Sequence, residues 1–214
     1  MSEICTDIID LLRKQDIRSI LILTDRNVDS HYPNFFKVLE QHFFVKKIVV
    51  PAGDSSKTLE QASAIWQMML ENAFDKDVFV LNFGGGMICD LGGFVASTYK
   101  RGVRFANLPT SLLAMIDASI GGKNGVNFNH IKNCIGLIHQ PSFMLPVDIN
   151  VLNTLPNAEL KSGFGEMIKY ALIDDAELFN QLCDIEQFTC ESISAEWISR
   201  CIAIKQKIVN QDPE

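Results

Sequence analysis

Residues 78–98 read VFVLNFGGGMICDLGGFVAST and decide the fold class of the chain. An apolar run is followed by three glycines and then by a helical pattern, which is typical of a buried strand, a tight turn and a helix. Glycines at such a turn let backbone N–H groups and the helix N-terminus meet a pyrophosphate, because unpaired amides and the helix dipole both favour an anion. The motif is not G-x-G-x-x-G, so a tight turn that binds nothing stays open as an alternative.

The same alternation continues on both sides of this stretch. Apolar runs predict further strands, and helical patterns predict helices between them, at residues 19–24 (strand), 32–43 (helix), 47–50 (strand), 58–73 (helix), 87–98 (helix) and 103–108 (strand). Strands that alternate with helices predict a mostly parallel, Rossmann-like sheet, which binds nucleotides at the carboxyl ends of its strands. We therefore expect an α/β domain over residues 1–155 that binds a nucleotide.

Residues 156–214 differ in character, because only helical periods follow Pro156. Helices are predicted at residues 158–173, 176–183 and 196–209. Three helices make a poor domain by themselves. We therefore expect residues 156–214 to be the start of an all-helical domain, and the natural protein to continue beyond them.

The composition is that of a soluble globular protein. The 214 residues carry a formal charge of -7, and 47% of them are hydrophobic. The sequence has no basic run or Lys/Arg stripe, which argues against nucleic acid as a partner. No apolar run reaches the roughly 18–20 residues of a membrane span, and the acidic start does not resemble a signal peptide. Six cysteines without a C-x-x-C pair fit reduced thiols, so we expect a cytoplasmic protein.

A second polar segment, PAGDSSK at residues 51–57, again joins a strand to a helix. Asp54 can accept hydrogen bonds from ribose hydroxyls, and Lys57 can meet a phosphate. A turn in which Ser56 or Thr58 caps the next helix is the alternative.

The densest polar segment covers residues 109–133, where a carboxylate, lysines and asparagines are spaced by glycines. Such groups can surround a small polyhydroxylated anion with charge-assisted hydrogen bonds. Nine of the thirteen glycines lie within residues 84–125, so we expect backbone to approach something closely in this window, and the polar residues to lie in a glycine-spaced loop. Ordinary solvated loop polarity is the alternative.

A fourth segment, GFGEMIKY at residues 163–170, lies inside a predicted helix. Glu166 and Lys169 are three residues apart and share a face. Each glycine costs a helix about 1 kcal/mol, so we expect something to approach this helix closely. A surface ion pair between Glu166 and Lys169 is the alternative.

In this order, the segments resemble the 3-dehydroquinate synthase family of sugar-phosphate cyclases. The resemblance rests on GGG-x-x-x-D-L-x-G-F, Y-x-RGVRF, PTSLLA-x-x-D-x-S-x-GGK, KN-x-IG-x-x-x-QP and GE-x-IKY, and it extends from about Asp25 to Glu214. It implies a phosphate-eliminating lyase of the shikimate pathway of aromatic amino acid biosynthesis. Such an enzyme converts 3-deoxy-D-arabino-heptulosonate 7-phosphate, a sugar phosphate, to 3-dehydroquinate with catalytic NAD and a divalent metal, zinc or cobalt.

The resemblance also implies the site residues. Those implied to bind NAD are Asp25, Asn27, Asp54, Lys57, Gly86, Met87, Asp90, Thr110, Ser111, Lys123, Lys132 and Thr154. Those implied to act on the substrate are Asp117, Lys123, Asn133, Lys169 and Arg101, and Arg101 is implied to reach substrate held by the second subunit of a homodimer. Glu166 is implied to be a metal ligand. Two departures concern fine cofactor geometry: Asp54 stands where the family often has glutamate, and Asn124 replaces a common threonine.

Histidines are missing where the family would need them. A catalytic zinc site has about three protein ligands, yet no histidine follows His139. Family members carry two metal histidines in a helical half that would begin where this chain ends, and His130 and His139 do not match them. We therefore expect the chain to lack an intact metal centre and to be inactive as it stands.

Two alternatives remain open at this point. Another sugar-phosphate cyclase or a metal-dependent polyol dehydrogenase of the same fold is the alternative enzyme, although the PTSLLA, GGK and KN series argues against the dehydrogenase. A nucleotide-binding fragment without catalysis is the alternative from another class.

Overall fold

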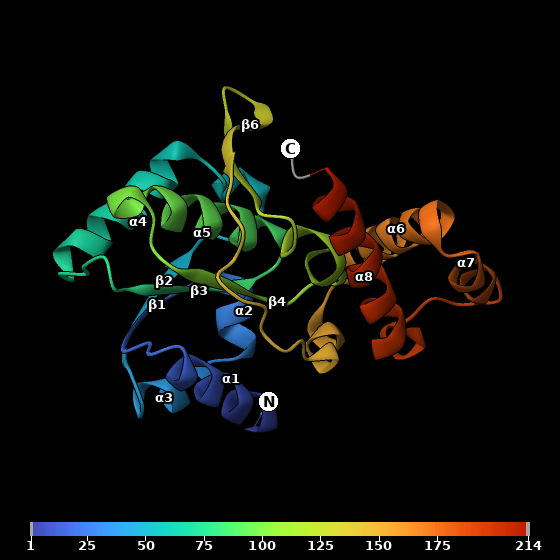
Figure 1. Cartoon of the computed structure of the whole chain (residues 1–214), viewed down its shortest axis with the longest axis horizontal. Coiled ribbons are helices and arrows are strands. Elements are labelled where there is room, and N and C mark those ends of the chain that lie inside the picture. The colour runs from blue at the N-terminus through green and yellow to red at the C-terminus, as the bar shows by residue number, and fades with distance from the viewer. Residues whose placement is uncertain (1, 213–214) are drawn as a thin grey trace.

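The computed structural model describes residues 2–212 and shows an α/β architecture around one parallel sheet (Figure 1). Its four strands lie in the order β2-β1-β3-β4. They are β1 (Ser19–Asp25), β2 (Phe44–Val50), β3 (Phe79–Gly84) and β4 (Phe105–Pro109). Each strand overlaps the apolar run that predicted it, and all three pairings are parallel, so the predicted fold class is confirmed.

Helices cover both faces of this sheet. All six residues of β3 are buried, as expected of a parallel strand covered on both sides. One face packs against α4 (Leu59–Glu71) and α5 (Gly86–Thr98), and the other packs against α1 (Ser2–Lys14) and α3 (Phe35–Glu40). Figure 1 shows these two layers above and below the strands.

A third hydrophobic core lies beside the sheet. It is built from α6 (Asn157–Asp174), α7 (Ala176–Cys183) and α8 (Ala195–Gln211), the three helices that the sequence predicted. Two earlier segments also enter it: the π-helical turn η3 (Ala114–Ala118) and the 3-10 helix η4 (Ile149–Thr154). The proposed division between residues 1–155 and 156–214 therefore stays a prediction, because this core takes side chains from both sides of it.

Residues 123–138 form a hairpin rather than a loop. Strand β5 (Lys123–Phe128) pairs antiparallel with β6 (Ile131–Ile138), and the hairpin stands out from the body in Figure 1. Gly125 faces Gly136 across it, and a Cβ added to Gly136 would lie 2.4 Å from the Asn124 carbonyl oxygen. The expectation of a glycine-spaced loop was wrong for this segment, since its glycines let two strands approach closely.

The predicted bounds of the helix at residues 32–43 were also wrong. The structure has α2 (Arg26–His31), a break at Tyr32, and then α3. Asp25 starts α2 as its N-cap, and Pro33 disfavours helical backbone at Tyr32, whose φ and ψ are −128° and 50°. Helix α1 was not predicted, although its buried residues follow a helical period.

Three short 3-10 helices complete the described chain: η1 (Asp54–Ser56), η2 (Tyr99–Arg101) and η5 (Cys190–Ser192). Within residues 2–212, no helix combines the length and the apolar character that crossing a membrane requires.

Candidate functional site

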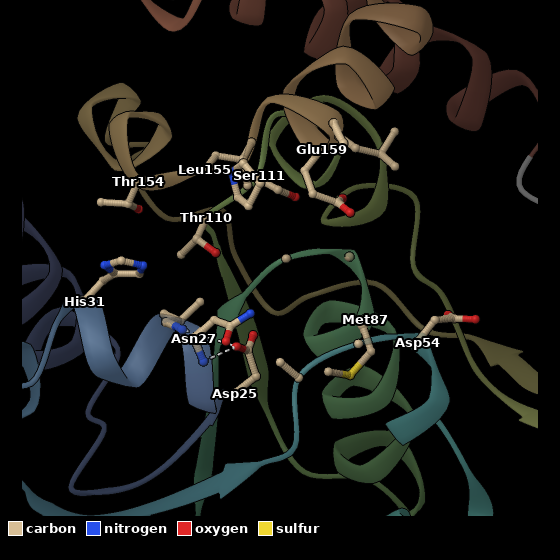
Figure 2. A pocket seen from close by; sticks show the side chains of 18 of the residues that line it. Asp25, Asn27, His31, Asp54, Met87, Thr110, Ser111, Thr154, Leu155 and Glu159 are labelled. Carbon is tan, nitrogen blue, oxygen red and sulfur yellow. Dashed lines mark hydrogen bonds between the residues drawn. The ribbon is translucent and has the colours of Figure 1, made fainter.

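A cavity of about 610 Å³ opens at the carboxyl ends of the sheet strands. Its walls come from the segments that follow β1, β2, β3 and β4, together with the end of η4 and the start of α6 (Figure 2). This is the edge of a parallel α/β sheet where nucleotides bind. Nine of the twelve residues implied to bind NAD line it: Asp25, Asn27, Asp54, Gly86, Met87, Thr110, Ser111, Lys132 and Thr154.

The first turn of α5 forms one wall of the cavity. Gly85 is the N-cap of this helix, and no side chain caps the amides that follow it. A Cβ added to Gly85 would lie 3.4 Å from Ser111 Oγ, and one added to Gly86 would lie 3.4 Å from Ala118 Cβ. The glycines therefore leave a bare cradle of backbone at a helix N-terminus, which suits an anion.

Asp25 holds the opposite wall. Its Oδ1 accepts hydrogen bonds from the backbone amides of Asn27 at 2.9 Å and Val28 at 3.2 Å, which fixes the start of α2. Both bonds use the same oxygen, so the cap does not occupy Oδ2. Figure 2 shows Asp25 beside Asn27 on this wall and Thr110 above them.

Lys57 contacts three other predicted residues, of which Asp54 lines the cavity. Only 4% of Lys57 is exposed, and its Nζ lies 2.9 Å from Asp90 Oδ2, 2.5 Å from Asn133 Oδ1 and 3.7 Å from Asp54 Oδ1. Burial raises the pKa of Asp90, although the charge of Lys57 and its hydrogen bond oppose that rise. Asp54 also pairs with Lys132, at 3.2 Å. The helix cap that was the alternative for residues 51–57 is present as well, since Thr58 Oγ1 accepts from the amide of Gln61.

A second polar group surrounds Asp117, and we call it the Asp117 cluster: Asp117, Glu166, Lys169, Tyr170 and Lys205. Tyr170 Oη donates to Asp117 Oδ1 at 2.6 Å, and Lys205 Nζ donates to the same oxygen at 2.7 Å. Lys169 donates to Glu166 and lies 4.6 Å from the centre of the Tyr170 ring. Three elements, η3, α6 and α8, thus bring one acid pair and two lysines together.

The cluster keeps Asp117 ionised. Burial by itself raises the pKa of Asp117, but hydrogen bonds from Lys205 and Tyr170 and the charges of Lys205 and Lys169 hold that pKa below its ordinary value. Burial and the bond to Asp117 raise the pKa of Tyr170. Tyr170 therefore stays a hydrogen-bond donor, and Asp117 stays an acceptor. The π-helical form of η3 is itself typical of functional sites.

Two predicted residues lie apart from these groups. Lys123 begins β5, is exposed and does not line the cavity. Arg101 ends η2, beyond the carboxyl end of α5, whereas the cavity lies at the amino end of that helix. At 1.5 Å per residue the 13 residues of α5 separate these ends by about 20 Å. Arg101 therefore does not line the cavity of its own chain.

Other residues of these groups were not predicted. His31, Tyr32 and Glu159 line the cavity, and Lys205 belongs to the Asp117 cluster. Lys205 carries a signal that was available, because a lysine on the otherwise apolar face of a predicted helix needs a partner. The cavity positions of His31 and Glu159 follow from how α2 and α6 are placed, which no local pattern reports.

Two family models match the chain. Residues 47–162 match the one described as 3-dehydroquinate synthase N-terminal, and residues 163–214 match the one described as 3-dehydroquinate synthase C-terminal. The chain belongs to the 3-dehydroquinate synthase family. This family was expected from the motif series, and that expectation is confirmed.

Curated members of the 3-dehydroquinate synthase family extend beyond the matched length. The 3-dehydroquinate synthase of Streptococcus pyogenes serotype M3 is 38% identical, over 95% of this chain and 57% of its own length. That of Prochlorococcus marinus is 39% identical, over 99% of this chain and 60% of its own length. The chain thus spans less than two thirds of the length of these relatives.

Solved structures show the same fold as this family member. A 2-epi-5-epi-valiolone synthase from Streptomyces hygroscopicus subsp. jinggangensis, solved with NAD+ and Zn2+ bound, has a TM-score of 0.81 and 32% identity over 91% of this chain and 56% of its own. A 2-deoxy-scyllo-inosose synthase, solved with carbaglucose-6-phosphate, NAD+ and Co2+, has a TM-score of 0.79 over 94% of this chain and 58% of its own. At 22% identity, the second likeness concerns the fold alone.

Proposed function

We propose that the protein acts as a 3-dehydroquinate synthase, eliminating phosphate from 3-deoxy-D-arabino-heptulosonate 7-phosphate to form 3-dehydroquinate. One observation carries this proposal. In a chain that matches both family models, a bare helix N-terminus, a strand-end acid and a buried lysine network surround one cavity beside a second polar cluster. A dinucleotide and a polyhydroxylated anion would thereby be held next to each other.

The cavity would hold NAD, and its walls would supply the contacts. The amides of Gly86 and Met87 would meet the pyrophosphate, and the carboxylates of Asp25 and Asp54 would accept hydrogen bonds from ribose hydroxyls. NAD bound there would supply hydride transfer to and from the substrate, and the residues of the chain would orient the reacting centre. The contacts proposed for NAD are those of the cavity together with Lys57, Asp90 and Lys123.

The substrate would lie toward the Asp117 cluster. Asp117 is an acceptor for substrate hydroxyls, because its neighbours keep it ionised. Lys123, Lys169 and Asn133 would pair with the anionic and hydroxyl groups of the substrate. We add Lys205 to this group, since its Nζ lies 2.7 Å from Asp117. The cluster's role in the reaction is to hold charged oxygens in a fixed orientation.

Arg101 is proposed to act across a homodimer. It lies at the far end of α5 from the cavity of its own chain, which supports a role at the site of a second copy. A cation supplied in this way would reach the phosphate of the neighbouring substrate. The active unit would then be a homodimer.

A complete metal site does not fit the described residues. Residues 2–212 contain no group of three or more His, Cys, Asp or Glu side chains that could hold a metal ion. Glu166, the proposed metal ligand, is paired with Lys169, and His139 binds Ser97 instead, with 2.9 Å between Nδ1 and Oγ. Because zinc needs about three protein donors, Glu166 would need further ligands from outside this part of the chain.

Calorimetric titration of this chain with NAD tests the cofactor site. We expect saturable binding that Gly86→Val abolishes, because the added side chain fills the cradle beside Ala118. Gly165→Ala is the matched control, since a Cβ there meets nothing within 4 Å, and this variant should bind NAD like the wild type. Equal NAD affinity in the Gly86→Val variant would place the cofactor elsewhere.

Phosphate release tests the reaction itself. We expect release from 3-deoxy-D-arabino-heptulosonate 7-phosphate by a protein that extends over the full length of the relatives, and none from this chain alone. Glucose 6-phosphate is the comparison substrate, because its carba analogue is bound in the 2-deoxy-scyllo-inosose synthase structure. Faster release from glucose 6-phosphate would replace the proposed substrate, and binding of NAD without release from either compound would leave a nucleotide-binding module.

A further inference from the structure

Two buried asparagines hold the turn that lies between Asp117 and Lys123. Asn107 Nδ2 donates to the Ser119 carbonyl at 3.2 Å. Asn124 Nδ2 donates to the Gly122 carbonyl at 2.7 Å and to the His139 carbonyl at 2.9 Å. Both asparagines are 7% exposed. The carbonyls at the two ends of the Ser119–Gly122 turn therefore each accept a hydrogen bond from a buried side-chain amide.

Two adjacent glycines of α5 make room for this arrangement. A Cβ added to Gly93 would lie 1.8 Å from Asn124 Oδ1. A Cβ added to Gly92 would lie 1.8 Å from Asn82 Oδ1. The Nδ2 of Asn82 donates to Asn107 Oδ1 at 2.9 Å. A side chain at either glycine would displace an asparagine. The amides are thus anchored by close packing against α5 and the sheet.

The turn itself is tightly enclosed on its other side. Gly121 and Gly122 have φ values of +89° and +68°, which L side chains rarely adopt. A Cβ on Gly121 would lie 3.3 Å from Lys205 Cε, and one on Gly122 would lie 2.7 Å from the His139 carbonyl carbon. A shift of the turn would therefore also disturb the lysine that binds Asp117.

We infer that Asn107 and Asn124 are positioning residues, which fix the Ser119–Gly122 turn and thereby the relative placement of Asp117 and Lys123. Their contribution to the reaction rests on the proposed function, because it acts through these two side chains. The restraint that they place on the turn does not rest on the proposed function, because it follows from the hydrogen bonds and the glycine packing alone. The asparagine at position 124, a departure from the common threonine, gains two carbonyl contacts through one amide.

Amide hydrogen exchange tests the hold on the turn. The amides of Ser119, Ile120 and His139 are suitable probes, because each donates a backbone hydrogen bond in or beside the turn. We expect Asn107→Leu to speed exchange at Ser119 and Ile120 about tenfold, and Asn124→Leu to do so at His139, since each loses its hydrogen bonds at nearly constant volume. Unchanged exchange at these amides in both variants would overturn the inference.

Two controls separate loss of the hold from general loss of stability. Ile65→Val truncates a fully buried side chain of α4, so it should lower the melting temperature without selective exchange at the turn. Gly93→Ala should displace Asn124 and speed exchange at His139. Adding Asn124→Ala to Gly93→Ala should restore the melting temperature but not the protection. Full recovery of protection in that double variant would overturn the inference, because packing alone would then explain it.

Kinetics decide whether the hold serves the reaction. In an enzyme that releases phosphate, both asparagine variants should lower kcat about tenfold. The Kd for NAD should change by less than kcat does, because Lys123 is one of twelve proposed NAD contacts and the cradle on α5 is untouched. Fast exchange with wild-type kcat would overturn the positioning role. Absence of release in the wild type would refute the proposed function instead, and the exchange result would still decide the hold on the turn.

Discussion

Burial disfavours the ionised form of the Asp117 carboxylate, and the neighbours of Asp117 stabilise that form again. Lys205 and Tyr170 bind it directly, and Lys169 adds a positive charge nearby. Folding lowers the pKa of Asp117, so the ionised carboxylate stabilises the folded state at pH values above the unfolded pKa of about 3.9. This stabilisation is lost as the pH falls through the folded pKa.

This linkage predicts a pH-dependent difference between two proteins. Below about pH 4, the melting temperature of the wild type should fall more steeply than that of Asp117→Asn, which has no carboxylate to protonate at this position. At pH 7 the wild type should be the more stable. Melting curves at half-unit pH steps measure this, and parallel pH profiles would show that the cluster does not depress this pKa.

Single residues also show what the sequence could not reveal. Asp117 was predicted as a site residue by the motif series, but its partner Lys205 is 88 residues away in the chain. The place of Lys205 on an otherwise apolar helix face indicates that it needs a partner, but only the packing of α8 against η3 shows that this partner is Asp117. Spacing arguments cover contacts within one element, whereas this contact depends on two elements that meet in space.

Helix α6 carries two glycines with different surroundings. The sequence predicted a close approach at both of them. A Cβ on Gly163 would lie 2.6 Å from Leu112 Cβ and 2.7 Å from the Leu113 amide nitrogen, so the prediction is confirmed there. Among the described residues nothing lies within 4 Å of a Cβ on Gly165, and no positive φ is required. For Gly165 the expected close approach is absent from this part of the chain.

The two glycines should therefore respond in opposite ways to alanine. Gly163→Ala should destabilise the protein by about 1–3 kcal/mol, because the backbone near Leu113 must move. Gly165→Ala should stabilise it by about 0.5–1 kcal/mol, because alanine favours the helix. Urea denaturation of both variants gives the two free energies of unfolding, and the same sign for both would contradict this assignment of the packing.

Elements with strong periodic patterns were predictable, and those held by close backbone contacts were not. The four strands of the sheet and helices α4 to α8 lie where their apolar patterns predicted them, whereas α1 was not predicted although its buried residues follow a helical period. Strand β5 reads KNGVNF, which lacks the β-branched content of a typical strand, so its glycine indicated a loop. The close pairing of Gly125 with Gly136 stabilises this strand, although the residues of β5 have a low propensity for strands.

The proposed dimer gives a prediction at the scale of the whole molecule. A protein with Arg101→Ala and one with Lys169→Ala should each lose turnover while retaining NAD binding. If Arg101 acts on the partner's site, unfolding and refolding a mixture of the two should restore activity, because in a hybrid dimer one site has both residues intact. A mixture that stays as inactive as its components would show that each chain uses its own Arg101.

The third hydrophobic core has a consequence for cooperativity. Since η3 and η4 pack into the same core as α6, α7 and α8, the helices cannot melt without exposing residues next to the sheet. The fluorescence of the two tryptophans of the chain, Trp66 and Trp197, can report on this. Trp66 joins α4 to the Val95 carbonyl of α5, and Trp197 joins α8 to Gln181 of α7.

Each tryptophan thus reports on one side of the molecule. Trp66→Phe leaves a probe among the helices, and Trp197→Phe leaves one beside the sheet. We expect the emission of both variants to change over the same range of urea concentration, because a shared core makes unfolding a single two-state event. If the urea midpoints of the two variants differ by more than the two substitutions themselves change the stability, the chain has two separate folding units.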